Sequence, residues 1–391
     1  MVIGPLSVES FRNLPPARLG FHPRLNLLVG ANGQGKTNVI ESLALVSGRA
    51  SFRTADLADV VREGANDATV TVGLAGEPAG ELAARIGRGR REHFWNGRKV
   101  SRVEASRKLP LVVLTAADLG RLGGPPSDRR RALDRVAVAH EPALAAEHRR
   151  YEKARADRIA LLGGPGRPDR DALAAFEEIL ASAGAAIAAS RRRWVGPLGR
   201  GLEEHARLLG LPYREISLRL VSELPADAPL PLLADALRSG LRLREETERR
   251  AGRSLFGPHR DDLVLLSGTL PLATRASSGE ARALVLAWAL AERSLLAEAG
   301  GRHPVLAFDD FDSEWDPDVL ARFARALPDD GQVFLSSARE RVARSLPLPA
   351  GAVWRVEAGR LAPSGPAAEA AAFVPAPARW PGERSDDVLA S

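Results

Sequence analysis

Residues 24–48 read RLNLLVGANGQGKTNVIESLALVSG. An apolar run ends at Gly30, GANGQGKT (30–37) matches G-x-x-x-x-G-K-[ST] without a mismatch, and a helical pattern closes at Gly48. A strand, a glycine-rich turn and a helix in this order predict a phosphate-binding loop, in which backbone N–H groups surround the phosphates of a nucleotide. Lys36 is expected to reach the β- and γ-phosphates, and the Thr37 hydroxyl to bind Mg²⁺. The candidate nucleotide-binding residues are Gly30, Ala31, Asn32, Gly33, Gln34, Gly35, Lys36, Thr37 and Asn38.

A second apolar strand ends in carboxylates. In PVLAFDD (304–310) the apolar residues run directly into Asp309 and Asp310. A carboxylate at the end of a strand suits the Mg²⁺ shell of a P-loop site, so Asp309 is the second candidate metal ligand beside Thr37. Asp310 is the candidate catalytic residue, which would orient the attacking water. The alternative is a pair of carboxylates that merely caps the strand end.

A second helix N-terminus begins in ASSGEARALVLAWAL (276–290). Ser before a long apolar run is good N-cap chemistry, so an ordinary capped helix is one interpretation. A helix N-terminus can also meet an anion. The triplet around Ser277 and Gly279 resembles the signature motif of ABC ATPases, in which this helix end contacts the nucleotide of a second copy. SEWD (313–316) resembles their D-loop.

Composition narrows the class of protein. The chain has 391 residues, a formal net charge of +6 and no cysteine, so a disulfide framework and a cysteine-based zinc site are excluded. No secretory signal pattern opens the sequence and no apolar run of about 18 residues is evident, which predicts a cytoplasmic protein without a membrane partner. The basic residues are almost all arginine. This excess favours contact with nucleic acid or reflects codon bias, and both explanations stay open.

The order of patterns predicts an α/β head interrupted by a helical insertion. Strand-like runs at 109–115, 303–311 and 331–338 accompany the first one, and a hairpin is expected across Ser267–Gly268. The expected segments are a first part of the head (1–125), a mostly helical arm (126–253), a second part of the head (254–361) and a Pro- and Ala-rich disordered tail (362–391).

Several of these stretches together resemble the RecF family of recombination mediators, which are ABC-type ATPases related to the SMC heads. The matching stretches are FRNL (11–14), the loop itself, GRASFRT (48–54), DRRRALDR (128–135), GPHRDDL (257–263), SSGEARAL (277–284), DDFDSEWD (309–316) and GQVFLSS (331–337). The resemblance implies an ABC/SMC-type P-loop head with an inserted arm, ATP and Mg²⁺ as cofactors, and an ATP-dependent homodimer that binds single-stranded, duplex or gapped DNA. It also implies RecR and RecO as partners, RecA loading at gaps, and weak DNA-dependent ATP hydrolysis.

Some positions depart from the family pattern. Glu280 stands where the signature usually has Gln, and a carboxylate there is expected to repel a triphosphate unless a cation such as Arg282 compensates. TAADL keeps only Asp118 of a Pro-Glu-Asp stretch, and Trp315 replaces a Leu. In the arm, Tyr151 and Arg158 are kept and their polar neighbours are not.

Two other functions stay open from sequence alone. A divergent DNA scaffold of the same fold would bind ATP without significant hydrolysis. A transporter-type ATPase shares the loop and the signature, but its switch position carries a His, whereas this chain has Ser336 and Ser337. His259 and Arg260 are left between a structural, a DNA-facing and a catalytic role. Arg129, Arg130 and Arg131 either contact DNA or form a solvated helix start.

Overall fold

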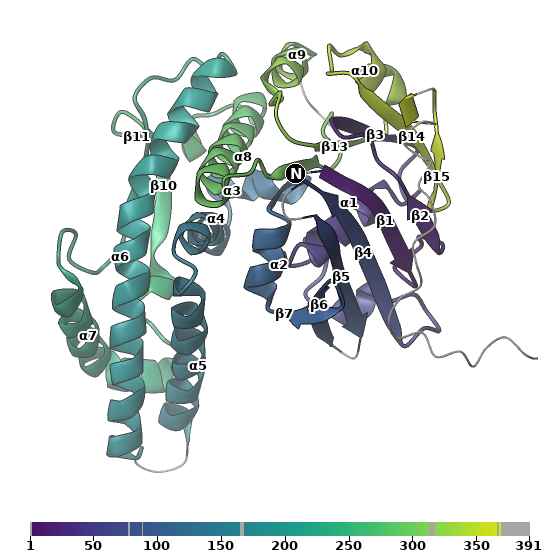
Figure 1. Cartoon of the computed structure of the whole chain (residues 1–391). Helices are drawn as coiled ribbons and strands as arrows, with labels where there is room; N and C mark the ends of the chain where they lie inside the picture. Colours follow the sequence, from purple (N-terminus) through teal and green to yellow (C-terminus); the bar gives the residue numbers. More distant parts are fainter. Residues whose placement is uncertain are drawn as a thin grey trace, which may run out of the picture. The chain divides into compact units, whose positions relative to one another are not determined.

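The computed structural model describes residues 2–76, 79–87, 89–164, 168–312, 317–365 and 367–368 (Figure 1). The chain divides into two compact units. Unit 1 comprises Met1–Thr115, Pro304–Glu314 and Leu327–Ser391, and unit 2 comprises Ala116–His303 and Trp315–Ala326. The segment 254–303, which the sequence assigns to the second part of the head, groups with the helical segment in unit 2.

Two six-stranded sheets form unit 1. The first sheet is antiparallel in the order β2-β1-β4-β5-β6-β7, with strands β1 (Val2–Glu9), β2 (Ala17–Leu19), β4 (Asp67–Ala75), β5 (Gly80–Gly87), β6 (Arg90–Trp95) and β7 (Arg98–Val100). The second has the order β15-β14-β3-β13-β12-β8, with β3 (Leu25–Val29), β8 (Leu111–Leu114), β12 (Val305–Phe308), β13 (Val333–Ser337), β14 (Gly351–Glu357) and β15 (Arg360–Pro363). Only β15 runs antiparallel to its neighbour in the second sheet.

Helix α1 lies between these sheets (Figure 1). It contacts β4 and β5 of the first sheet and β8 and β13 of the second, and its Val39, Ile40 and Leu43 are fully buried in the shared core. The helical segments of unit 1 are α1 (Lys36–Val46), η1 (Leu57–Val60), α2 (Arg102–Lys108) and α10 (Glu340–Ser345). A helix buried from both sides has little freedom to move, so the loop that precedes α1 starts from a fixed point.

The central strands of the second sheet match the sequence-based expectation. Every residue of β3, β8, β12 and β13 is buried, as parallel strands covered on both faces require. The apolar runs at 24–30, 109–115, 303–311 and 331–338 are therefore confirmed as strands. Because β3, β13 and β12 are parallel neighbours, their carboxyl ends lie at one edge of the sheet.

Helices make up most of unit 2. They are η2 (Ala116–Leu119), α3 (Gly120–Gly123), α4 (Pro126–His140), α5 (Leu144–Gly163), α6 (Arg170–Leu208), α7 (Leu230–Ala251), η3 (Pro258–Arg260), η4 (Leu272–Thr274), α8 (Ser278–Gly300) and α9 (Pro317–Ala326). Pro142 lies in the short break that separates α4 from α5. In Figure 1, α5 and α7 flank the long helix α6, and apolar side chains from all three form a second core.

A small antiparallel sheet completes unit 2, in the order β11-β10-β9. Its strands are β9 (Ile216–Val221), β10 (Asp262–Ser267) and β11 (Leu270–Pro271). The expected hairpin is present: Ser267 pairs with Leu270, and Gly268 turns the chain with a φ of +58°. Helix α6 packs closely on β9, since a Cβ on Gly199 would lie 3.1 Å from the backbone N of Leu218.

The arm also buries charge. Arg158 of α5 lies in the interior, where it donates to Glu248 and to the carbonyl of Leu241 at 3.0 Å, and its guanidinium lies 3.4 Å from Glu177. A charge is tolerated in a protein interior when it is paired and hydrogen-bonded. This explains why Arg158 is kept in the arm although its polar neighbours are not.

One helix corrects the expectation that no segment is apolar enough to span a membrane. By length and composition alone α6 passes such a test, with a mean hydropathy of 1.5 over its best window. Half of that window is buried inside the protein, which is also what the core helix of a soluble protein shows. Alanine-rich turns without charges produce the high hydropathy of α6.

The C-terminal segment differs partly from the disorder expected from residue 362. Strand β15 continues to Pro363, and Ala368 is buried in the core of unit 1. Residue 366 and residues 369–391 lie outside the described residues, as does the D-loop-like stretch 313–316.

Candidate nucleotide site

Three parallel strands bring the two predicted metal ligands together in unit 1. The Thr37 hydroxyl, at the start of α1, donates to Oδ1 of Asp309 at 3.1 Å. The Ser336 hydroxyl, at the end of β13, donates to the same oxygen at 2.6 Å. Asp309 follows β12, so residues 272 positions apart in sequence meet at one carboxylate. The neighbouring hydroxyl of Ser336 was assigned no role from sequence.

The environment of Asp309 is unfavourable for a lone negative charge. Its exposed fraction is 8%, and burial raises the pKa of Asp309 above its usual range. The adjacent carboxylate of Asp310 raises this pKa further, whereas hydrogen bonds from Ser336 and Thr37 and the charge of Lys36 lower it. A bound cation would remove the cost of burying this charge.

Asp310 occupies a strained position beside this carboxylate. Its φ is +48°, which is uncommon for a residue other than glycine, and its backbone N–H donates to the Ser336 hydroxyl at 2.8 Å. Its Oδ1 is buried and accepts no hydrogen bond from the described part of the chain. An unsatisfied buried acceptor next to Asp309 fits a role toward a group that the chain itself does not supply.

The described residues contain no group of three or more His, Cys, Asp or Glu side chains that would hold a metal ion. The donor set at this site is one hydroxyl and one carboxylate. Mg²⁺ is commonly held by one or two protein oxygens together with phosphate oxygens and water, so Thr37 and Asp309 fit this ion.

The phosphate-binding loop places Lys36 against its own backbone. The ammonium of Lys36 donates to the carbonyl of Gly30 at 2.8 Å and to that of Ala31 at 3.0 Å. Ala31, Asn32 and Gly33 are exposed, and a Cβ on Gly33 would have no atom within 4 Å. The middle of the loop is therefore open to a ligand while its ends are anchored.

The turn between β14 and β15 anchors one end of the loop. The backbone N–H of Ala358 donates to the side-chain oxygen of Gln34 at 2.6 Å, and that of Gly359 donates to the Gln34 carbonyl at 2.8 Å. A Cβ on Gly35 would lie 3.2 Å from the Cα of Gly359 and 3.0 Å from Oδ1 of Asn13. Gly35 thus has a packing role as well as the phosphate-binding role predicted for it.

The first turn of α1 is tied to residues of the stretches FRNL and GRASFRT. The Asn38 amide donates to Asn13 at 2.6 Å, and Arg53 donates to Asn38 at 2.5 Å. Further along α1, the fully buried carboxylate of Glu41 accepts two hydrogen bonds of 2.8 Å from Arg12. Arg12, Asn13 and Arg53 lie in these stretches, but the sequence patterns predict no function for them.

The signature-like helix α8 belongs to unit 2 and begins with a complete capping box. The Ser277 hydroxyl accepts from the Glu280 N–H at 3.3 Å, and the Ser277 N–H donates to Oε2 of Glu280 at 2.8 Å. Ser277 is exposed, and a Cβ on Gly279 would meet no atom within 4 Å. The Glu280 carboxylate thus satisfies an N–H group that would otherwise be unpaired at this helix end, and the expected repulsion of a triphosphate stays a prediction.

His259 is a packing residue of unit 2. Its Nδ1 lies 2.8 Å from the hydroxyl of Tyr151, and its Nε2 lies 3.3 Å from the carbonyl of Ser254. Burial lowers the pKa of His259 to about 4, so the imidazole is neutral near pH 7. These contacts favour the structural role among those left open for His259, and they also explain why Tyr151 is kept.

The arginine run at the start of α4 is neither wholly solvated nor wholly free for DNA. Arg129 is buried and binds Asp262 through two hydrogen bonds of 2.8 and 2.9 Å. Arg130 donates to the carbonyl of Asp261 at 2.5 Å, and Arg131 pairs with Asp128. The solvated interpretation is therefore wrong for Arg129, which ties α4 to β10.

The RecF/RecN/SMC N terminal domain matches residues 2–353 of the chain. "DNA replication and repair protein RecF" of Anaeromyxobacter sp. (strain Fw109-5) is 36% identical over 374 residues, with 92% of this chain and 98% of that protein covered. The protein of the same name from Myxococcus xanthus (strain DK1622) is 35% identical over 344 residues, with 85% and 89% covered. The chain belongs to the RecF family of DNA replication and repair proteins.

Solved structures give the same fold. A structure titled "Structure of the recombination mediator protein RecF-ATPrS in RecFOR pathway" has a TM-score of 0.80 and 24% identity, and covers 93% of this chain and 98% of that chain. A structure of the SMC head bound to the C-winged helix domain of ScpA has a TM-score of 0.52 and 16% identity, covering 93% and 97%. The predicted ABC/SMC-type P-loop head of the RecF family is thereby confirmed.

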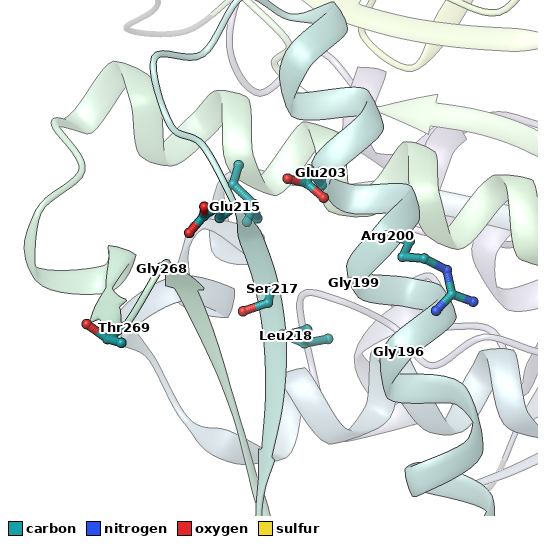
Figure 2. Close-up of a pocket in the computed structure, with 10 residues that line it drawn as sticks. Gly196, Gly199, Arg200, Glu203, Glu215, Ser217, Leu218, Gly268 and Thr269 are labelled. Atoms are coloured by element: carbon teal, nitrogen blue, oxygen red, sulfur yellow. The ribbon is translucent and has the colours of Figure 1, made fainter.

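One hollow in unit 2 of this RecF-family chain contains none of the sequence-predicted site residues. It has a volume of about 730 Å³ and is lined by residues of α6, β9 and the β10–β11 turn (Figure 2). Its lining includes Gly196 and Gly199 of α6 and the charged residues Arg200, Glu203 and Glu215.

Proposed function

We propose that this protein is an ATP-dependent, DNA-binding dimer that acts as a recombination mediator. The observation that carries the proposal is the meeting of Thr37 and Asp309 at the end of the P-loop, with the buried Oδ1 of Asp310 unsatisfied beside Asp309. Similar proteins are named for DNA replication and repair, and similar solved structures carry ATP in their titles. By analogy with these relatives, the protein works in the cytoplasm with RecR and RecO so that RecA is loaded on single-stranded DNA at gaps.

The chemistry of the site follows from its donors. Lys36 exchanges the carbonyls of Gly30 and Ala31 for the β- and γ-phosphates of ATP, with N–H groups of the loop completing the phosphate shell. Thr37 and Asp309 would hold Mg²⁺, which would supply positive charge next to the phosphates. Asp310 orients the attacking water.

Lys36→Ala is expected to weaken binding of Mg·ATP at least about 100-fold, because the variant removes the one ammonium within the loop. Isothermal titration calorimetry measures this directly. Lys99→Ala is the matched control, because Lys99 is an exposed lysine of unit 1 that pairs with Glu92. Equal ATP affinity in the Lys36 variant and the parent would contradict the proposed site.

The second part of the proposal concerns α8. In a two-fold dimer each subunit lends the helix end at Ser277 and Gly279 to the γ-phosphate held by the P-loop of the other subunit. The helix dipole adds favourable charge to this contact. ADP lacks the phosphate that is bound, so the dimer depends on ATP.

Ser277→Arg is expected to abolish ATP-dependent dimerisation, since a bulky side chain at the cap fills the space that a phosphate must enter. Analytical ultracentrifugation with ATP and with ADP gives the mass of each form. Ser182→Arg, at an exposed position of α6, is the control for adding the same side chain. The dimer proposal fails when the parent has the same mass in both nucleotides, or when Ser277→Arg dimerises as well as the parent.

The third part is DNA binding through charge, which rests on the net charge of +6 and on the family. Phosphate contacts by arginine give affinity without reading base sequence. We expect the dissociation constant for gapped DNA to rise by roughly 100-fold or more between 50 and 200 mM salt, as for proteins with several phosphate contacts. Filter binding on two unrelated sequences tests this. A flat salt dependence, or strong preference for one sequence, would argue against it.

A further inference from the structure

The carboxylate of Glu280 has a second donor, and this donor comes from outside α8. Tyr213, in the connection between α6 and β9, donates its hydroxyl to Oε2 of Glu280 at 2.9 Å. The same oxygen accepts the N–H of Ser277 at 2.8 Å. One carboxylate oxygen is therefore held between the helix cap and a tyrosine that lies 67 residues away in sequence.

Some backbone N–H groups at this helix end already have acceptors within the protein, so only the others can bind an anion. The N–H groups of Ser277 and Glu280 are occupied within the capping box, and the N–H of Ala281 donates to the carbonyl of Ser277 at 2.8 Å. Ser278 and Gly279 supply the remaining N–H groups of the first turn. A carboxylate is favoured at a helix N-terminus for the same reason as a phosphate, so an unrestrained Glu280 would compete for this pair.

The charge states of the two side chains agree with this geometry. The hydrogen bond from the Ser277 N–H lowers the pKa of Glu280, and the hydrogen bond from Tyr213 lowers it by a smaller amount. Partial burial and the hydrogen bond to Glu280 raise the pKa of Tyr213 to about 12. Near neutral pH a phenol therefore donates to a carboxylate. This donation holds the charge on the Ser277 side of the helix end.

We propose that Tyr213 is a positioning residue for the signature: it holds the Glu280 carboxylate on the Ser277 N–H and away from Ser278 and Gly279. The arrangement lets a glutamate occupy the capping position without taking the N–H pair that the phosphate needs. This role rests on the proposed ATP-dependent dimer. It gives the connection between α6 and β9 a direct influence on nucleotide-dependent assembly.

The substitution Glu280→Gln removes the negative charge of this side chain but keeps its size and shape. Both Glu and Gln complete a capping box at this position, so Glu280→Gln keeps the acceptor for Ser277 and for Tyr213 but has no negative charge. Tyr213→Phe removes only the hydroxyl. When the tyrosine acts by restraining a charge, its loss matters in the parent and not in the glutamine variant. A tyrosine that merely stabilises the loop is needed equally in both.

The test is a double-mutant cycle on the dimerisation constant in Mg·ATP, measured by analytical ultracentrifugation. We expect Tyr213→Phe to weaken the dimer about ten-fold, Glu280→Gln to dimerise at least as tightly as the parent, and the double variant to match Glu280→Gln. The proposal is overturned when Tyr213→Phe equals the parent, or when the double variant is as weak as Tyr213→Phe. Glu203→Gln, at an exposed position of α6, controls for loss of one negative charge.

A second measurement tests the contact between Tyr213 and Glu280 independently of dimerisation. The chain has two tyrosines, Tyr151 and Tyr213, so ¹³Cζ-labelled tyrosine gives two NMR signals, and Tyr151→Phe assigns them. Glu280→Gln should shift the Tyr213 signal without nucleotide, and Glu203→Gln should not. An unmoved Tyr213 signal overturns the contact. A parent that stays monomeric in ATP while this signal shifts refutes the proposed dimer, and the positioning role with it, but leaves the hydrogen bond established.

Discussion

The arrangement of the candidate nucleotide site in unit 1 depends on one buried carboxylate. Asp309 is withdrawn from water at the end of β12 and is held by hydroxyls from α1 and β13. A negative charge in this position is costly unless a cation accompanies it, and the raised pKa of Asp309 expresses that cost. Thr37 can reach it only because β3, β13 and β12 are parallel neighbours and because α1 is fixed between two sheets.

The P-loop is shaped by packing as much as by its own sequence. N–H groups of the β14–β15 turn donate to the side-chain oxygen and to the backbone carbonyl of Gln34. Gly35 fits between Asn13 and Gly359. These contacts leave Ala31, Asn32 and Gly33 exposed. Glycines that sequence reasoning assigns to phosphate contact alone therefore also allow two backbones to approach closely.

Sequence patterns predicted the features that are local. The loop, the strand ending at Asp309 and the cap at Ser277 each follow from a few adjacent residues, and all are where they were expected. The partners of these features were missed because they come from far along the chain: Ala358 is 324 positions from Gln34, and Tyr213 is 67 positions from Glu280. The donors to Glu280 could not be predicted for the same reason, since the sequence around a carboxylate does not show which distant groups donate to it.

The most direct test of the account is whether Thr37 and Asp309 bind one Mg²⁺ together. ATP affinity of the parent, Thr37→Val, Asp309→Asn and the double variant is measured by calorimetry with Mg²⁺ and with EDTA. The account predicts that each single variant loses most of the Mg²⁺-dependent gain in affinity and that the double variant loses no more than the larger single loss. A Mg²⁺-dependent gain that survives in both single variants, or losses that simply add, would contradict it.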